Sequence, residues 1–275
     1  YYLPIPDPEE CDDAFWEASS ELVGLDVREE AALRLLEEVV VPRLDEFRAT
    51  FPDDPDPERP GFFLINGGYM AVDAHVYYAL IRHFRPARVV EVGGGSSTVL
   101  AAAALRANRR ETDAPAELIV IEPHPGPELE RHLEGIGELL ATKVQDVGLD
   151  LFRSLSAGDV LFIDSSHVLR AGGDVQFEYL EVLPRLAPGV LVHVHDVSLP
   201  GPYPRVYFEQ QLFWNEQYLL QAFLAFNHAF EILWPGTLIA ERHPDVVRRV
   251  FPEVTAMRER YPHAVPSAFW MRVRP

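Results

Sequence analysis

Two apolar runs of this chain each lead into side chains that can bind a metal ion or take up a proton. Asp164 follows the run DVLFI, and His167 lies just beyond it. His195 and Asp196 follow the run VLVHV. Carboxylates and imidazoles both bind divalent ions, and an imidazole titrates near neutral pH, so that it can also act as a general base. These four residues are therefore the candidates for catalysis.

Two chemistries stay open for this set. With an ion, Asp164, His195 and Asp196 are the ligands, and His167 can add a second imidazole, which moves the preference from magnesium toward manganese, iron or zinc. Without an ion, His167 or His195 is the base that deprotonates a hydroxyl. His193 alternates with His195 along the same predicted strand, and we expect it to pack in the core.

A glycine-rich turn lies upstream of these residues. The run RVVEV is followed by Gly93, Gly94 and Gly95, and then by an alanine-rich segment with high helix propensity. This order indicates a strand, a tight turn and a helix. Glycines let a ligand approach the main chain closely, and the first N–H groups of a helix have no partner inside it. Those groups belong to Ser96, Ser97 and Thr98. The turn is typical of a nucleotide site.

Two kinds of nucleotide compete for this turn. A dinucleotide fingerprint needs G-x-G-x-x-G, and Thr98 stands where its third glycine is required. Glu91, just before the turn, suits an ammonium group better than a pyrophosphate. An NAD(P)-dependent oxidoreductase remains the rival interpretation, although the chain has no Tyr-x-x-x-Lys pair because its only lysine is Lys143.

An acidic residue ends the next predicted strand, 118–121. Glu122 follows this strand directly, and one carboxylate can accept hydrogen bonds from both hydroxyls of a ribose. NAD enzymes share this feature, so Glu122 indicates a nucleoside without choosing between cofactors.

The order of the elements predicts the fold. Strands alternate with helices, which implies a parallel sheet with right-handed crossovers. Its strands are predicted at 89–92, 118–121, 139–144, 159–163 and 190–194. Ligands of such sheets bind at the carboxyl ends of the strands, where five predicted site residues would converge. They are Gly93, Glu122, Asp146, Asp164 and Asp196.

The flanking segments divide the chain. Residues 28–50 have apolar side chains at helical spacing, and the run FPDDPDPERP at 51–60 reads as a linker. We therefore predict an N-terminal extension over 1–60, with an extended lead-in at 1–10, and a catalytic domain over 61–275. Helices are also predicted at 70–84 and 175–186.

A proline-rich loop and an aromatic segment follow the fifth strand. We expect residues 198–205 to form a lid and residues 209–226 to form one long helix. Trp214, Asn215 and Glu216 are the residues of this segment that we expect to contact an acceptor substrate.

The glycine turn resembles a known motif. Glu91, Gly93, Gly95 and Ser97 match (D/E)-x-G-x-G-x-(G/S), which is motif I of the class I S-adenosylmethionine (SAM) methyltransferases. The turn LAPG at 186–189 is similar to the L-x-P-G before strand five of that family. The resemblance covers about residues 61–273. It implies a Rossmann-like α/β fold with a seven-stranded, mostly parallel sheet, helices on both faces and a reversed final hairpin, here at 230–233 and 268–273.

The resemblance also implies roles for individual residues. Glu91 would lie at the methionine end of SAM, and the three glycines would lie against the cofactor, next to Asp164. Tyr69, just before the helix at 70–84, would help to close the cofactor site. Asp146 would meet the adenine amino group, although an Asp here can equally form a turn.

The chemistry candidates resemble one branch of this family. An Asp after strand four and an acidic pair after strand five are similar to the metal-dependent sugar and catechol-type O-methyltransferases, the branch with macrolide-sugar and cephalosporin-type relatives. In that branch the pair tends to be two carboxylates, whereas here it is His195 and Asp196. We expect SAM-dependent O-methylation of a small-molecule acceptor from sugar or secondary metabolism, with or without a divalent metal. A SAM-binding or metal-binding protein without methyl transfer stays a further alternative.

Composition limits the partners. The 43 acidic and 24 basic residues give a net charge of −19, which argues against nucleic acid or an anionic membrane. The single cysteine, Cys11, excludes an internal disulfide and a cysteine-based metal cluster. We expect a cytoplasmic protein; whether it forms a homo-oligomer stays open.

Overall fold

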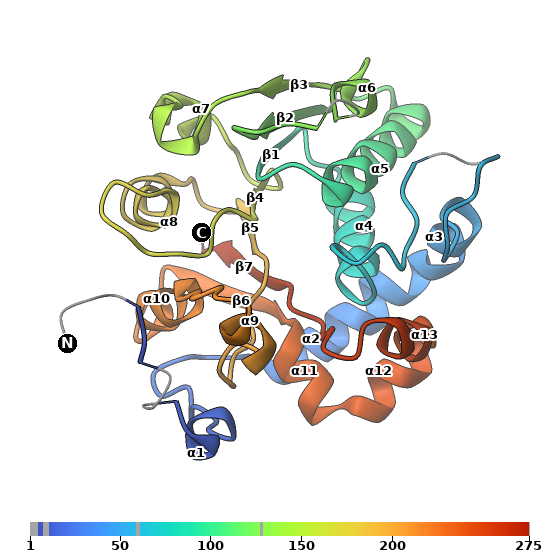
Figure 1. Ribbon diagram of the computed structural model, residues 1–275. Coiled ribbons are helices and arrows are strands. Elements are labelled where there is room, and N and C mark those ends of the chain that lie inside the picture. The colour runs from blue at the N-terminus through green and yellow to red at the C-terminus, as the bar shows by residue number, and fades with distance from the viewer. Residues whose placement is uncertain (1–4, 8–10, 59–60, 127–128, 275) are drawn as a thin grey trace.

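A seven-stranded sheet forms the centre of the computed structural model, which describes residues 5–7, 11–58, 61–126 and 129–274 (Figure 1). The strand order is β3-β2-β1-β4-β5-β7-β6. The strands are β1 (Arg88–Val92), β2 (Glu117–Ile121), β3 (Gly137–Leu140), β4 (Val160–Ile163), β5 (Leu191–Val194), β6 (Phe230–Pro235) and β7 (Phe269–Val273). Only β7 runs against its neighbours, β5 and β6. The predicted Rossmann-like fold with its final hairpin is confirmed.

The pairing register brings the carboxyl ends of the central strands to one edge. Val92 lies opposite Ile121 and Ile163, and Ile163 lies opposite Val194. These strands are buried apolar runs, as expected for a parallel sheet covered on both faces. The residues that follow them therefore lie side by side. They are Gly93, Glu122, Asp164 and His195.

Helices cover both faces of the sheet. Figure 1 shows α4 (Asp73–Phe84) and α5 (Ser96–Thr112) on one side. On the other side lie α7 (Leu149–Arg153), α8 (Asp174–Phe177) and α10 (Glu216–Leu224). Apart from the N-terminal helices described below, the chain also forms α6 (Leu129–Leu133), α9 (Arg205–Glu209), α11 (Gly236–Arg242), α12 (Pro244–Val250) and α13 (Glu253–Arg260). None of the helices in the described part of the chain is long and apolar enough to cross a membrane.

Two predicted helices are helical throughout but irregular. Over 28–50, α2 (Glu29–Leu35) passes through a π-helical turn and a 3-10 turn into α3 (Leu44–Thr50). Over 175–186, α8 continues in the same way. Pro42 and Pro184 lie in the two 3-10 turns, and a proline has no N–H for the regular α-helical ladder.

The N-terminal helices pack on the catalytic part of the chain. Leu36, Val40 and Phe47 belong to the same apolar core as the sheet, and Arg82 of α4 donates to Glu46 at 2.6 Å. A short helix, α1 (Asp13–Trp16), precedes them. The division at residue 60 stays a prediction. Residues 59 and 60 of the predicted linker, and most of the lead-in, lie outside the described residues.

Two predicted elements are wrong in their extent. The third strand ends at Leu140, and the expected 139–144 continues as a loop into a 3-10 turn at Val144–Asp146. The single helix expected over 209–226 is two helices, because α9 ends at Glu209 and α10 begins at Glu216. The N–H groups that start α10 bind the carbonyl oxygen of His167 instead of continuing a helix from α9.

The glycine turn gives a matched pair of stability variants. Gly93 has a φ of +88°, and a Cβ there would lie 2.0 Å from the carbonyl oxygen of Asp164, whereas a Cβ on Gly95 would meet nothing within 4 Å. Gly93→Ala should lower the free energy of unfolding by at least about 2 kcal/mol. Gly95→Ala should lower it much less. Urea unfolding of both variants measures this, and equal losses would contradict the described turn.

Candidate active site

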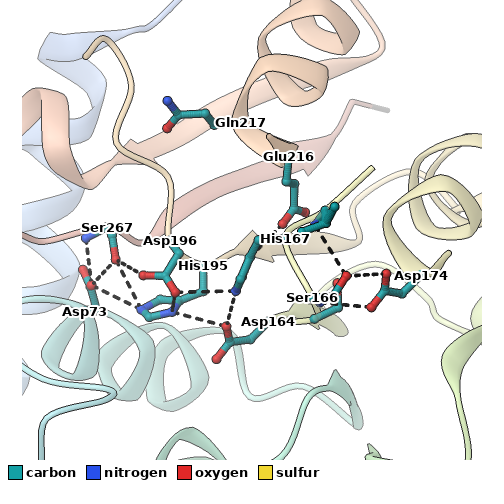
Figure 2. Close-up of polar contacts among 12 residues, drawn as sticks. Asp73, Asp164, Ser166, His167, Asp174, His195, Asp196, Glu216, Gln217 and Ser267 are labelled. Atoms are coloured by element: carbon teal, nitrogen blue, oxygen red, sulfur yellow. Dashed lines mark hydrogen bonds and ion pairs between the residues drawn. The ribbon is translucent and has the colours of Figure 1, made fainter. Parts of the chain in front are cut away.

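Asp164 lies between two imidazoles. Its N–H group donates to the carbonyl oxygen of Val92, which fixes the residue at the end of β4. Its Oδ1 lies 3.2 Å from Nε2 of His167 and 3.4 Å from Nδ1 of His195 (Figure 2). Burial alone would raise the pKa of Asp164, but the charges and hydrogen bonds of the two imidazoles hold it well below its usual range.

The pair after β5 completes a group of three possible metal ligands. Asp196 has a φ of +54°, and its Oδ2 lies 3.5 Å from Nδ1 of His195. One donor atom each from Asp164, His195 and Asp196 lies within 4.8 Å of the others. Burial alone would lower the pKa of His195, but Asp196 and Asp164 raise it well above its usual value. Two carboxylates and one imidazole form a suitable donor set for a divalent ion.

His167 joins this group from the loop after β4. Its Nε2 also lies 3.5 Å from Oδ2 of Asp196, while its Nδ1 lies 2.9 Å from Oε2 of Glu216. The four residues proposed from the sequence are thus brought together. His193, by contrast, is fully buried, with its ring stacked 4.2 Å from that of Phe162.

Asp73 and Ser267 extend the site, and neither was among the residues predicted from the sequence. Asp73, the first residue of α4, accepts from the N–H group of Ser267 at 2.8 Å, and its Oδ2 lies 3.6 Å from Nε2 of His195. Its Oδ1 is buried and has no hydrogen-bond partner. An acidic residue at a helix start is too common to have identified Asp73, because the helix dipole favours one there in any case.

The glycine turn and Glu122 face one cavity of about 330 Å³. Glu122 accepts from the N–H groups of Gly94 at 3.2 Å and of His124 at 2.7 Å, which holds its carboxylate at the end of β2. Gly93 and Asp164 line the same cavity. Asp146 is not among the lining residues; because β3 ends early, Val144 and Gln145 occupy that part of the wall.

Glu91 and Tyr69 are buried close to the turn. Oε2 of Glu91 accepts from the hydroxyl of Thr98, while its Oε1 has no partner, and burial raises the pKa of Glu91 to about 8. The hydroxyl of Tyr69 is also buried without a partner, and its ring lies 4.9 Å from that of His195. At the start of α5, Ser96 is half-buried, whereas Ser97 and Thr98 are buried.

A second cavity of about 360 Å³ opens on the other side of the cluster. Asp73, Asp196 and Ser267 line it, with Tyr207 of α9 and Tyr261 after α13. Since Asp164 lines the first cavity and Asp196 the second, the cluster lies between the two.

The lid predicted over 198–205 stays a prediction, because no residue of that loop lines the second cavity. The part of the segment after β5 that lines the second cavity is Val206, Tyr207 and Gln210, beyond the predicted loop at 198–205. Trp214, Asn215 and Glu216 lie against the loop of His167, and their contact with an acceptor stays a prediction.

Two solved structures share features with this chain at low similarity. The apo-structure of CmcI-N160 is 15% identical with a TM-score of 0.37, and the match covers 60% of this chain and 64% of that one. The [4+2]-cyclase SpnF is 16% identical with a TM-score of 0.30, and the match covers 92% and 98%. Both TM-scores are too low for either structure to indicate what this chain does.

Part of the chain matches a known protein family. Residues 90–197, which contain the glycine turn and all four chemistry candidates, match the family model of a methyltransferase domain. An uncharacterized protein of Archaeoglobus fulgidus is 31% identical over 163 residues, which are 56% of this chain and 71% of that protein. The chain therefore belongs to the family of this archaeal protein, and its residues 90–197 are similar to a methyltransferase domain.

Proposed function

We propose that this chain is a SAM-dependent methyltransferase that methylates a hydroxyl group of a small molecule from sugar or secondary metabolism. One observation carries the proposal: the cluster of Asp164, His195 and Asp196 lies between the cavity of the glycine turn and a second cavity. A methyl donor in the first cavity and an acceptor in the second would meet at this cluster.

The residues of the first cavity suit SAM. The open space beside Gly95 leaves the main chain accessible, and Glu122 can accept from ribose hydroxyls. The partnerless Oε1 of Glu91 and hydroxyl of Tyr69 would gain partners from the polar methionine end of the cofactor. A cationic ammonium beside Glu91 would also oppose the effect of burial on its pKa.

Methyl transfer here would be an in-line displacement. The acceptor oxygen forms a bond to the methyl carbon, the bond from that carbon to sulfur breaks, and the hydroxyl proton has to leave. Asp196 lines the acceptor cavity and can orient the hydroxyl. Asp164, His195 and Asp196 would hold a divalent ion, which lowers the pKa of a bound hydroxyl. Without an ion, His167 or His195 would be the base. This route requires the neutral imidazole, although the neighbouring carboxylates raise the pKa of both residues and favour the charged form.

Replacing Glu122 tests the cofactor site. Glu122→Ala should weaken SAM and S-adenosylhomocysteine binding by about 10- to 100-fold, because hydrogen bonds to a charged group are lost. Glu117→Ala, at the opposite end of β2, is the matched control and should bind as the wild type does. Calorimetric titration measures both, with NAD as a competing ligand. Unchanged SAM affinity in Glu122→Ala would remove the ribose role.

Replacing Asp196 separates chemistry from cofactor binding. Asp196→Ala should lower turnover by at least about 100-fold, because the acceptor hydroxyl loses its orienting or ion-binding group. Its affinity for SAM should stay near that of the wild type. Transfer of label from SAM into a metabolite extract of the source organism measures turnover. An active variant would show that methyl transfer does not need Asp196.

Removing metal distinguishes the two routes of proton removal. If the cluster holds an ion, dialysis against a chelator should stop methyl transfer and added Mg²⁺ or Mn²⁺ should restore it. Full activity in the chelator, with no metal found in the dialysed protein by elemental analysis, would leave an imidazole as the base.

A further inference from the structure

The loop that carries His167 is fastened to the start of α10. His167 has a φ of +58°, in the left-handed region that residues other than glycine rarely adopt. Its carbonyl oxygen accepts from the N–H groups of Asn215 at 2.9 Å and Glu216 at 3.1 Å. The N–H group of Leu169 donates to Oδ1 of Asn215 at 2.6 Å. These bonds hold the backbone of residue 167 in its unusual conformation.

The same segment also holds the His167 side chain. The ring of Trp214 lies 4.5 Å from the imidazole, between ring centroids. Oε2 of Glu216 lies 2.9 Å from Nδ1, although the two residues are 49 positions apart in the sequence. Three consecutive residues, Trp214, Asn215 and Glu216, thus contact His167 through a ring, the backbone and a carboxylate.

The carboxylate decides which imidazole nitrogen faces the cluster. At this distance Oε2 of Glu216 can accept a hydrogen bond from Nδ1 of His167, which requires the proton on Nδ1. The other nitrogen, Nε2, then faces Oδ1 of Asp164 at 3.2 Å and Oδ2 of Asp196 at 3.5 Å. A second carboxylate or carbonyl group that fixes the ring in this way is a common feature of metal-binding histidines.

Glu216 itself cannot touch a substrate. Its side chain is fully buried, and it lines neither of the two cavities beside the cluster. As the first residue of α10 it lies where the helix dipole favours a negative charge. A buried carboxylate is costly unless it is paired, and among its neighbours His167 supplies a direct partner.

We propose that Glu216 is a positioning residue, which holds His167 with Nδ1 protonated and Nε2 directed at Asp164 and Asp196. His167 thereby becomes the fourth donor of the cluster. The inference rests on the proposed function, because it concerns the same cluster, but it can be tested without turnover.

A neighbouring glutamate provides a matched control. Glu178 is also buried, and its Oε2 accepts from the hydroxyl of Ser165 at 3.0 Å. It has the same side chain as Glu216 but bonds Ser165 rather than His167. The same substitution at either position therefore removes a buried carboxyl group. Only the substitution of Glu216 also removes the contact to Nδ1 of His167.

The first measurement uses metal-free protein with ¹⁵N-labelled histidine. The wild type should show a slowly exchanging, hydrogen-bonded Nδ1–H signal that is assigned to His167 by its loss in His167→Gln. Glu216→Met should lose this signal and Glu178→Met should keep it. Glu216→Gln should also keep it, because the amide oxygen can still accept.

The second measurement uses Mn²⁺ alone, followed by electron paramagnetic resonance. Glu216→Met should bind Mn²⁺ about 10- to 100-fold more weakly than the wild type, and Glu178→Met should bind it equally well. Pulsed spectra should show nitrogen couplings from both imidazoles in the wild type and from that of His195 alone in Glu216→Met. If Glu216→Met does not fold, Glu216→Leu and Glu178→Leu replace the Met pair, with the same expected results, because leucine also lacks an acceptor for Nδ1.

The outcomes separate the two proposals. An unchanged His167 signal together with unchanged Mn²⁺ affinity in the Glu216 variant would overturn the positioning role. Loss of the signal in that variant alone supports the role even if the wild type binds no Mn²⁺, in which case the metal route of the proposed function fails. A wild type with both signatures that transfers no methyl group from SAM would refute the proposed function and leave the positioning role in place.

Discussion

The parallel pairing of β1, β4 and β5 is the constraint on which the site depends. Because these strands are in register, the residues after them emerge at one edge of the sheet. A hydrogen bond from Asp164 N–H to Val92 continues this pairing beyond the strands. Gly93 has to be a glycine for the same reason, since the backbone of Asp164 occupies the place of its Cβ. The glycine turn and the cluster of Asp164, His195 and Asp196 thus lie at the same edge of the sheet.

Charge pairing within this edge explains why the cluster can be buried. Two imidazoles alternate with two carboxylates, and each charge would be expensive to bury alone. Asp73 lies next to Nε2 of His195, and Glu216 lies next to Nδ1 of His167, which adds one more carboxylate beside each imidazole. The arrangement leaves Asp164 at one cavity and Asp196 at the other. Donor and acceptor would therefore meet at a polar site enclosed by an apolar core.

Sequence reasoning reached the residues that directly follow strands and failed for those that depend on packing. Asp164 and His195 could be predicted because strand ends share an edge. Asp146 was placed by a strand that ends earlier than expected, and Val144 and Gln145 line the cavity there, so that its contact with the adenine stays a prediction. Asp73 and Ser267 meet the cluster from α4 and from the loop before β7, and no local pattern marks such contacts. Glu216 was singled out for an acceptor contact, but its side chain pairs with His167, and it begins α10 rather than lying inside one long helix.

A crystal structure with S-adenosylhomocysteine tests the central claim most directly. We expect the nucleoside to lie over residues 93–95 with its ribose hydroxyls on Glu122 and its sulfur directed at the cluster of Asp164, His195 and Asp196. A ligand bound elsewhere, or a turn closed by side chains in the complex, would contradict the account.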